Sequence, residues 1–385
     1  MDRVKIQRKL LLWALERSGK TQDAMKGKFP KIADWLSGEV YPTLKQLDKF
    51  AAATYTPLGY FFLNEPPEDK LPIPDFRTVK GEPERPSPNL LDTIQAMQSR
   101  REWMREFLLE EGQKPLSFIR SATLRTEPVK LAMEMRNILS LSGGWANRAH
   151  TWTEALRLLR KAIEDAGVMI VINGVVGNNT HRLLDVEEFR GFALVDEYAP
   201  LIFINGRDYI SAQMFTLIHE LSHLWLGYEG VSIFDKLQPV KTNVEEFCNQ
   251  VTAEFLVPSD EFKKAMEENQ RENSDDLFQL IAKRFKVSPI VAARRALDMK
   301  YISKNRFFDF YNKYVKNIDT DKEISRKSKN TGGDFWHTQI VRIGELFGSA
   351  VAQATLEGRL LYRDAYRLTG LRGKTFDNYV AQLGF

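Results

Sequence analysis

The sequence predicts a mostly helical α+β fold, and three observations support this. Apolar residues recur at helical spacing through most of the 385 residues. Only three short apolar runs, all between residues 168 and 204, have the length and the Gly, Asp, Asn or Pro boundaries typical of strands. Hydrophobic residues make up 43% and charged residues 28% of the chain, which is the balance of a globular protein with two or three domains at roughly 150 residues each.

Neither a membrane span nor a secretory leader is expected. No run approaches the roughly 18 uninterrupted apolar residues of a membrane-spanning helix. The apolar run near the N-terminus is short, is flanked by charge and lacks a small-residue cleavage site. Cys248 is the only cysteine, so an intrachain disulfide is excluded. Together these features favour a reducing, cytoplasmic location.

The net charge of +4 hides a division along the chain. Residues 1–57 carry 11 Lys and Arg against 6 Asp and Glu, and residues 300–385 carry 15 against 9. The intervening residues 58–299 carry 29 against 36. The two basic ends are compatible with binding to nucleic acid or to an acidic protein, and equally with an ordinary solvated surface.

Residues 1–63 are expected to form one module of four short helices. Thr21 and Thr43 are suitable N-caps, and Ser-Gly pairs end the first and third helices. The expected helices are 5–17, 22–28, one marked by Ile32, Trp35 and Leu36, and one marked by Leu44, Leu47, Phe50 and Ala51. Short helices packed this closely in sequence predict a helix-turn-helix domain.

A Pro-rich linker is expected at residues 64–89, which contain seven prolines between positions 66 and 88 and therefore favour extended backbone. The main domain is expected at 90–300, with its core at 150–300, followed by a helical region at 301–385. In these parts the predicted helices are 90–111, 128–141, 153–166, 212–226, 244–256, 260–269, 275–285, 289–297, 340–357 and 362–368; the predicted strands are 168–172, 191–195 and 201–204; and 317–334 is expected to be a loop.

A metal-binding motif lies in the helix expected at 212–226. His219-Glu220-Leu221-Ser222-His223 has the pattern H-E-x-x-H. Residues four apart share one face of a helix, so both imidazoles can reach a single ion while Glu220 stands beside them as a base for water. This spacing predicts a catalytic zinc site held by His219 and His223.

A catalytic zinc usually takes a third protein ligand. The helix expected at 244–256 offers Glu245, Glu246 and Glu254. Glu245 is preferred because Asn249 lies four residues later on the same face, where its side chain can orient a ligand histidine from behind. Glu246 is the alternative ligand, and both Glu246 and Glu254 are otherwise expected to be solvated.

These segments resemble the ImmA/IrrE metallopeptidases. The resemblance rests on RGFALVDEYAPLIFING, FTLIHELSHLWLG and EEFCNQVTAEFLVP, with LIAKRFKVSPIVAARRAL as a weaker match, and covers roughly residues 150–300. It implies a zincin-like domain with a small sheet of three or more strands, zinc on His219, His223 and Glu245, and Glu220 as general base. The family's E-x-x-A-N pattern has Cys248 in place of Ala, and we expect this cysteine to be a small buried residue rather than a ligand.

Peptide hydrolysis is the reaction that the resemblance implies. A zincin usually lays its substrate along a sheet edge above the metal-binding helix, and residues 201–205 are the expected edge. The sequence does not identify an auxiliary group for the oxyanion; Tyr209, Tyr228, His181 and His337 are the available side chains, although each is more simply a packing or surface residue.

Residues 20–60 resemble the XRE-type helix-turn-helix found before such peptidase domains. Phe29-Pro30 replaces the usual glycine-containing turn, and the expected recognition helix from Lys31 is short and contains Asp34. Lys31 is the strongest candidate for a base contact, and phosphate contacts are expected from Lys26, Lys28 and Lys45. The alternative is a helical module for dimerisation or partner docking.

Two functions follow from the sequence. The first is a zinc-dependent endopeptidase fused to a DNA-binding module, which cleaves a specific repressor or toxin-system partner to control phage, mobile-element or stress genes. The second is a non-enzymatic, antitoxin-like transcriptional regulator whose zincin domain only binds a partner protein. Both allow a homodimer. A purely structural zinc is disfavoured because such sites normally close all four positions with Cys and His.

Overall fold

The computed structural model describes residues 3–68, 71–74, 86–232, 243–269, 274–325 and 334–385. The chain divides into two compact units, which are described separately. Unit 1 comprises Met1–Pro72 with Thr78–Gln95, and unit 2 comprises Ile73–Arg77 with Ala96–Phe385. As the sequence predicts, the fold is α+β and mostly helical, with a small sheet in unit 2.

Within its described residues, unit 1 contains four short α-helices, one 3₁₀ turn and the first turns of the longer helix α5 (Pro88–Glu110). Thr21 caps α2 and Thr43 caps α4, where Thr43 and Gln46 form a reciprocal capping box. Gly38 ends α3 in the left-handed conformation, with φ of +83°. The elements are α1 (Arg8–Arg17), α2 (Gln22–Lys26), α3 (Ile32–Ser37), α4 (Leu44–Ala53) and η1 (Leu58–Phe62). Their buried faces enclose an aromatic core formed by Phe29, Trp35, Phe50 and Phe61.

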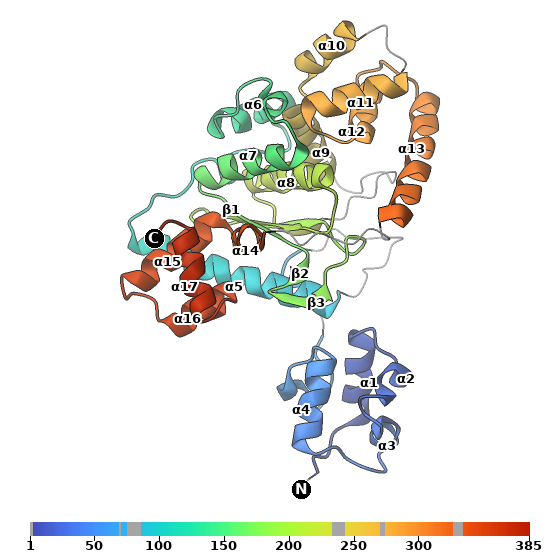
Figure 1. Cartoon of the computed structure of the whole chain (residues 1–385), viewed down its shortest axis with the longest axis vertical. Coiled ribbons are helices and arrows are strands. Elements are labelled where there is room, and N and C mark those ends of the chain that lie inside the picture. The colour runs from blue at the N-terminus through green and yellow to red at the C-terminus, as the bar shows by residue number, and fades with distance from the viewer. Residues whose placement is uncertain (1–2, 69–70, 75–85, 233–242, 270–273, 326–333) are drawn as a thin grey trace. The chain divides into compact units, whose positions relative to one another are not determined.

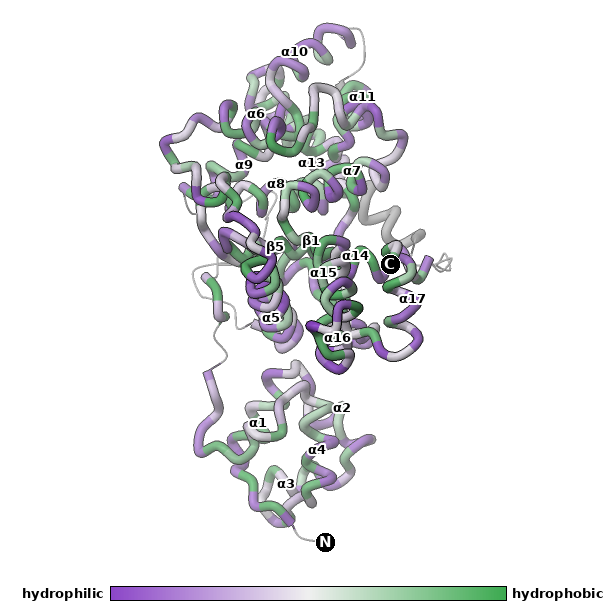
Figure 2. The backbone as a smooth tube through the Cα atoms, turned by 90° about the vertical axis from the view of Figure 1, so that its left-hand side faces the viewer, coloured by the Kyte–Doolittle hydropathy of each residue, from purple (hydrophilic) through white to green (hydrophobic). Residues whose placement is uncertain are grey.

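The main sheet of unit 2 has the strand order β1-β5-β4-β6. Its strands are β1 (Met169–Asn173), β4 (Gly191–Leu194), β5 (Leu201–Asn205) and β6 (Gly230–Ser232). β1 and β5 run parallel, whereas β4 is antiparallel to both β5 and β6. β1, β4 and β5 are the three strands that the sequence predicts. Their side chains are buried throughout, and the tube through β1 and β5 is mostly green in Figure 2.

The sequence does not predict the three remaining strands. β2 (Val175–Val176) and β3 (Asn179–Leu183) form a separate hairpin, and β3 is largely exposed and mostly polar. β6 is only three residues long. None of them has the apolar alternation that marks a half-buried strand, so pairing partners rather than local pattern define them.

Helices surround the main sheet. α7 and α8 lie above it in Figure 1, while α14, α15 and the unit 2 part of α5 lie below. The helices are α5 (Pro88–Glu110), α6 (Pro128–Ile138), α7 (Trp152–Asp165), α8 (Ile210–Leu226), α9 (Asn243–Leu256), α10 (Ser259–Glu268), α11 (Ser274–Phe285), α12 (Pro289–Asp298), α13 (Lys304–Ser325), α14 (Phe335–Ile343), α15 (Glu345–Leu356), α16 (Tyr362–Thr369) and α17 (Lys374–Gln382), with a 3₁₀ turn η2 (Trp145–Arg148). Among the described helices, none is both long and apolar enough to cross a membrane.

Two sequence predictions for the C-terminal region are wrong. The expected single helix 340–357 is broken at Gly344, which has φ of +90° and lies so close to β1 that a Cβ atom there would be 2.7 Å from the Ile170 carbonyl oxygen. The expected loop 317–334 is helical as far as Ser325, where α13 ends. The remainder of that loop, apart from Asp334, lies outside the described residues.

Two buried charges fasten the C-terminal helices to the rest of unit 2. Arg100 of α5 donates hydrogen bonds to the carbonyls of Arg342, Ile343 and Leu368, at the ends of α14 and α16. Glu164 of α7 accepts hydrogen bonds from the N–H groups of Glu345 and Leu346, in the first turn of α15. Each charge therefore meets the helix end of opposite partial charge.

Candidate metal centre

The central helix α8 carries the H-E-x-x-H motif through the interior of unit 2. His219 and Glu220 are 0% exposed and His223 is 1% exposed. The helix is apolar on most of its circumference because it packs against the sheet on one side and against α7 and α9 on others. Gly227 ends it in the left-handed conformation, with φ of +77°. Polar side chains buried this deeply need partners, and α9 supplies those of the two histidines.

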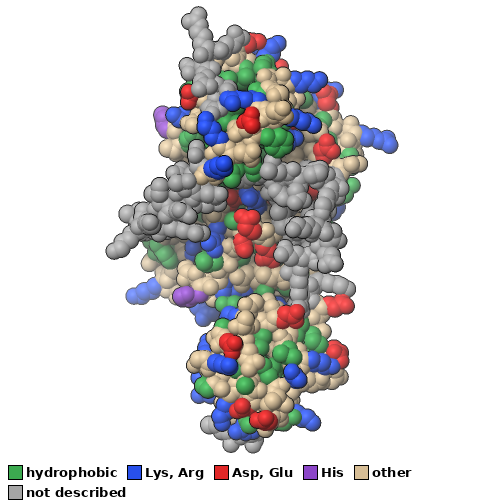
Figure 3. All heavy atoms as spheres, turned by 90° about the vertical axis from the view of Figure 1, so that its right-hand side faces the viewer, with side chains coloured by type: hydrophobic (Ala, Val, Ile, Leu, Met, Phe, Trp, Pro, Cys, Tyr) green, Lys and Arg blue, Asp and Glu red, His purple; other side chains and the backbone are tan. Residues whose placement is uncertain are grey.

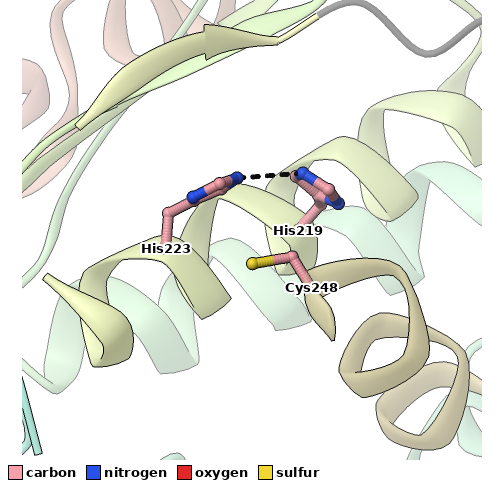
Figure 4. A group of neighbouring side chains, drawn as sticks. All are labelled: His219, His223 and Cys248. Atoms are coloured by element: carbon pink, nitrogen blue, oxygen red, sulfur yellow. Dashed lines mark hydrogen bonds between the residues drawn. The ribbon is translucent and has the colours of Figure 1, made fainter. Parts of the chain in front are cut away.

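The crossing of α8 and α9 brings three metal-binding groups together. Nε2 of His219 lies 2.9 Å from Oε2 of Glu245 and 3.0 Å from Nε2 of His223. Nε2 of His223 lies 3.2 Å from Oε1 of Glu245. The structure therefore places side by side the three residues that the sequence singles out as metal ligands (Figure 4 shows the two histidines with Cys248).

Asn249 orients one of these ligands from behind. Nδ1–H of His219 donates to Oδ1 of Asn249 at 3.1 Å, which leaves the lone pair of Nε2 directed at His223 and Glu245. The i, i+4 spacing of Glu245 and Asn249 on α9 is what allows one residue to face the metal-binding edge of the imidazole and the other its opposite edge. This is the contact expected from the sequence.

The other two carboxylates of α9 lie elsewhere. Glu246 is exposed, as expected of a solvated helix residue. The expectation that Glu254 is solvated is wrong. Its side chain is 12% exposed, forms an ion pair with Arg295 of α12 and accepts hydrogen bonds from Ser259. The long range of this pairing explains why the α9 sequence alone did not indicate it.

Charge and burial adjust the protonation of the cluster. Burial is the largest effect on His219 and lowers its pKa, against the opposing pull of Glu245. Burial acts to raise the pKa of Glu245, but its electrostatic and hydrogen-bonding interactions with His219 and His223 outweigh it and hold that pKa well below its usual range. Both shifts favour the deprotonated form of the group, which is the form that binds a cation.

Cys248 lies beside the cluster, with its sulfur within 4.8 Å of the ligand nitrogens. Burial, together with the negative charges of Glu245 and Glu220, raises the pKa of this thiol well above its usual value. Because the thiolate is the form that binds metals, the pKa favours the packing role expected from the sequence.

Gly191 of β4 lies against α8 next to Glu220. A Cβ atom on Gly191 would lie 2.7 Å from Cγ2 of Thr216, 2.9 Å from the Phe203 carbonyl oxygen and 3.3 Å from Cγ of Glu220. β4 therefore approaches α8 at Thr216 more closely than a larger residue permits, and a side chain here would also press on Glu220. Sequence reasoning missed this contact, although a glycine inside an apolar strand is a known sign of close backbone approach.

The edge strand is also not the predicted one. Residues 201–205 form β5, which is paired on both sides by β1 and β4, so it cannot accept a peptide along an edge. Among the described strands, the outer positions belong to β1 and β6. β1 packs against α14 and α15. β6, the strand that leads into the grey trace, passes on the side of α8 that carries the two imidazoles (Figure 4).

The four side chains considered for an oxyanion role are dispersed. Tyr209 directly precedes α8, ten residues and thus about 15 Å along the helix from His219. His181 is an exposed residue of β3, and His337 is exposed on α14. Tyr228 is 44% exposed and follows the C-terminus of α8, where its N–H bonds to the His223 carbonyl. Of the four, only Tyr228 closely follows a proposed metal ligand, His223, in the sequence.

The donor set fits a divalent metal ion. Two imidazole nitrogens and a carboxylate converge within 3.2 Å of one another. Ligand atoms bound tetrahedrally at about 2.0–2.1 Å lie about 3.3 Å apart, which is close to these separations.

Residues 163–297 match the family model of the IrrE N-terminal-like domain, a peptidase family. The matched range contains the whole sheet below α7 together with α8, α9 and the ligand cluster. It supports the resemblance to the ImmA/IrrE family and identifies this part of the chain as a metallopeptidase-like domain. Residues 343–382 match a separate domain of unknown function, DUF8813, which covers α15, α16 and α17. No curated protein matches the chain.

Proposed function

We propose that the protein is a zinc-dependent endopeptidase that cleaves a specific regulatory protein, such as a repressor or a toxin-system partner. The observation that carries this proposal is the convergence of Nε2 of His219, Nε2 of His223 and the Glu245 carboxylate beside the buried Glu220. Three protein ligands with an adjacent carboxylate are the set of a hydrolytic zinc site, since a structural site normally has four.

The roles of the residues follow from their positions. His219, His223 and Glu245 would hold the zinc, which when bound supplies Lewis-acid polarisation of the scissile carbonyl and of the attacking water. A carboxylate oxygen of Glu220 takes the proton of that water and delivers it to the nitrogen of the leaving amine. Asn249 keeps His219 in the tautomer whose Nε2 is a ligand.

Metal analysis combined with proteolysis tests the proposal. We expect the wild type to bind one equivalent of zinc, and His219→Ala to lose it. Glu220→Gln should keep the zinc and lose cleavage of the products of neighbouring genes by about 10²- to 10⁴-fold, because only proton transfer is removed. Glu246→Gln is the matched control, since this exposed carboxylate adjoins Glu245 and should leave both zinc and cleavage unchanged.

Two outcomes would contradict the peptidase. One is a zinc-loaded wild type that cleaves none of these proteins. The other is a cellular phenotype that survives Glu220→Gln. An intact partner that co-purifies with the protein, and stays inhibited after both histidines are lost, would favour the non-enzymatic regulator instead.

We further propose that unit 1 binds DNA. The four lysines proposed to contact DNA are exposed around α2, α3 and the start of α4: Lys26, Lys28 and Lys45 for phosphates and Lys31 for a base edge. On the face shown in Figure 3, the lower body mixes Lys and Arg with Asp and Glu. Weak, strongly salt-dependent binding is therefore expected, and its absence at low salt in a filter or mobility-shift assay would exclude the role.

A further inference from the structure

The outward edge of β6 already has a bonding partner from another part of the chain. The N–H of Val231, in the middle of β6, donates to the carbonyl oxygen of Pro74 at 3.1 Å. Val231 is paired with Phe192 of β4 on its other side. Because a strand amide points to one side only, this N–H belongs to the edge of β6 that faces away from β4. An edge amide of this kind is the group that an added strand bonds to.

This edge lies next to the proposed catalytic base. Ser232 of β6 is in register with Gly191 of β4, and Gly191 lies against Glu220. In Figure 4, β6 lies on the side of α8 to which the imidazoles of His219 and His223 point. A peptide that is to reach Glu220 and the ligand cluster in extended form therefore has β6 as its nearest described strand with an outward edge.

The segment that occupies the edge suits this position. Ile73 precedes Pro74, and a residue before proline is restricted to extended backbone. Ile73 is 5% exposed, so the segment is anchored by a buried apolar side chain as well as by the hydrogen bond. Pro74 has no N–H, so at this residue the segment can accept a hydrogen bond from β6 and cannot donate one. It therefore imitates part of an added strand.

We propose that the Ile73–Pro74 segment of the linker is an internal occupant of the edge of β6, which a substrate peptide must displace before cleavage. This inference rests on the proposed peptidase function for its catalytic consequence. A substrate must then bind the edge of β6 more tightly than the chain's own proline-containing segment does. This requirement favours a specific protein over peptides in general.

Substitution of the anchor tests the inference on the full-length, zinc-loaded protein. Ile73→Asp places a charge where a buried apolar side chain stands and should release the segment, while Ile73→Val is the matched control that preserves shape and burial. Hydrogen exchange of the Val231 amide is the first measurement and needs neither zinc nor activity. We expect protection in the wild type and in Ile73→Val, and exchange at least about tenfold faster in Ile73→Asp.

Two zinc-directed probes provide the second measurement. A peptidyl hydroxamate long enough to lie along β6 should bind Ile73→Asp about tenfold more tightly than the wild type or Ile73→Val, because it no longer competes with the segment. Acetohydroxamate, which is too short to reach the edge, should bind all three equally. Cleavage of fluorescent casein should increase in Ile73→Asp by a similar factor and vanish with Glu220→Gln.

The outcomes separate the two proposals. Equal Val231 exchange in all three proteins, or equal binding of the peptidyl hydroxamate despite faster exchange, overturns the internal occupant. If casein is not cleaved by any protein but the exchange and peptidyl hydroxamate results are as expected, the occupant stands and the peptidase proposal fails. Equal unfolding temperatures and zinc contents for Ile73→Asp and Ile73→Val establish that the substitution acts locally.

Discussion

The metal centre and unit 1 hold their polar residues in opposite ways. His219, Glu220 and His223 are almost fully buried, and the two histidines meet defined partners, whereas Lys26, Lys28, Lys31 and Lys45 are exposed on separate elements. Burying a polar group costs free energy unless its partners are in place, so a buried cluster specifies one arrangement. Exposed lysines carry no such cost and are compatible with many surfaces. A buried, convergent set is therefore stronger support for a function than an excess of charge.

The largest predicted effect concerns Glu164, a buried carboxyl outside the metal centre. It tests whether burial of a polar group with partners in place still costs free energy when the group ionises. Burial raises its pKa to about 7, against the opposing charge of Arg160. In the unfolded chain the carboxyl titrates near 4.5, so the unfolded state loses its proton first as pH rises. The stability that Glu164 contributes is thus greatest at low pH and falls between about pH 4.5 and 7, by about 3 kcal/mol.

Glu164→Gln isolates this contribution, since glutamine keeps an acceptor oxygen for the N–H groups of Glu345 and Leu346 and does not titrate. We expect the free energy of unfolding of the wild type to fall relative to the variant when denaturant titrations at pH 5 and pH 7.5 are compared. If the free energies of unfolding of the two proteins change with pH in parallel, ionisation of the buried Glu164 carboxyl does not destabilise the fold.

Gly191 tests how closely β4 must approach the proposed base. Gly191→Ala forces Cβ against the Phe203 carbonyl oxygen and Cγ2 of Thr216, so we expect unfolding to become easier by about 2 kcal/mol and Glu220 to be displaced. Gly143→Ala is the control, because its Cβ would meet its nearest neighbour at an ordinary 3.4 Å. Denaturant titration gives the stability, and an unchanged Gly191→Ala would contradict the close approach.

Asn249 separates metal binding from packing within the cluster. In Asn249→Ala, Nδ1 of His219 loses its acceptor, and we expect zinc affinity to fall by roughly tenfold to a hundredfold in a chelator competition. Asn249→Asp keeps an acceptor at this position and should retain most of the affinity. Equal affinities for Asn249→Ala and the wild type would show that the orientation of His219 does not depend on this contact.

Lys45 gives the smallest expected effect on the protein itself. Lys45→Gln should change the stability of unit 1 by no more than about 0.5 kcal/mol, because the side chain is exposed. If Lys45 contacts a phosphate, the slope of log affinity against log salt should decrease by about 1. Lys49→Gln, which changes another exposed lysine of α4, serves as the control. Equal slopes for the two variants would remove Lys45 from the DNA interface.

The sequence predicted features that short stretches of chain determine. The helical spacing of His219 and His223 and of Glu245 and Asn249 is local, so those pairs were predictable, as were the caps at Thr21 and Thr43. Glu254 and Gly344 were misinterpreted because their partners, Arg295 and the Ile170 carbonyl, are distant in sequence. Strand order has the same origin: nothing in residues 201–205 distinguishes a central strand from an edge.

The hydrogen bonds of Arg100 and Glu164 to the C-terminal helices also determine where the chain can be truncated. The family match for the peptidase-like domain ends at residue 297, which invites a stop codon soon afterwards. Such a truncation would remove the helix ends that Arg100 and Glu164 bond to, and it would uncover the side of β1 that α14 and α15 pack against. The homology boundary therefore lies inside unit 2, and a shortened protein that keeps these contacts carries α14–α17 with it.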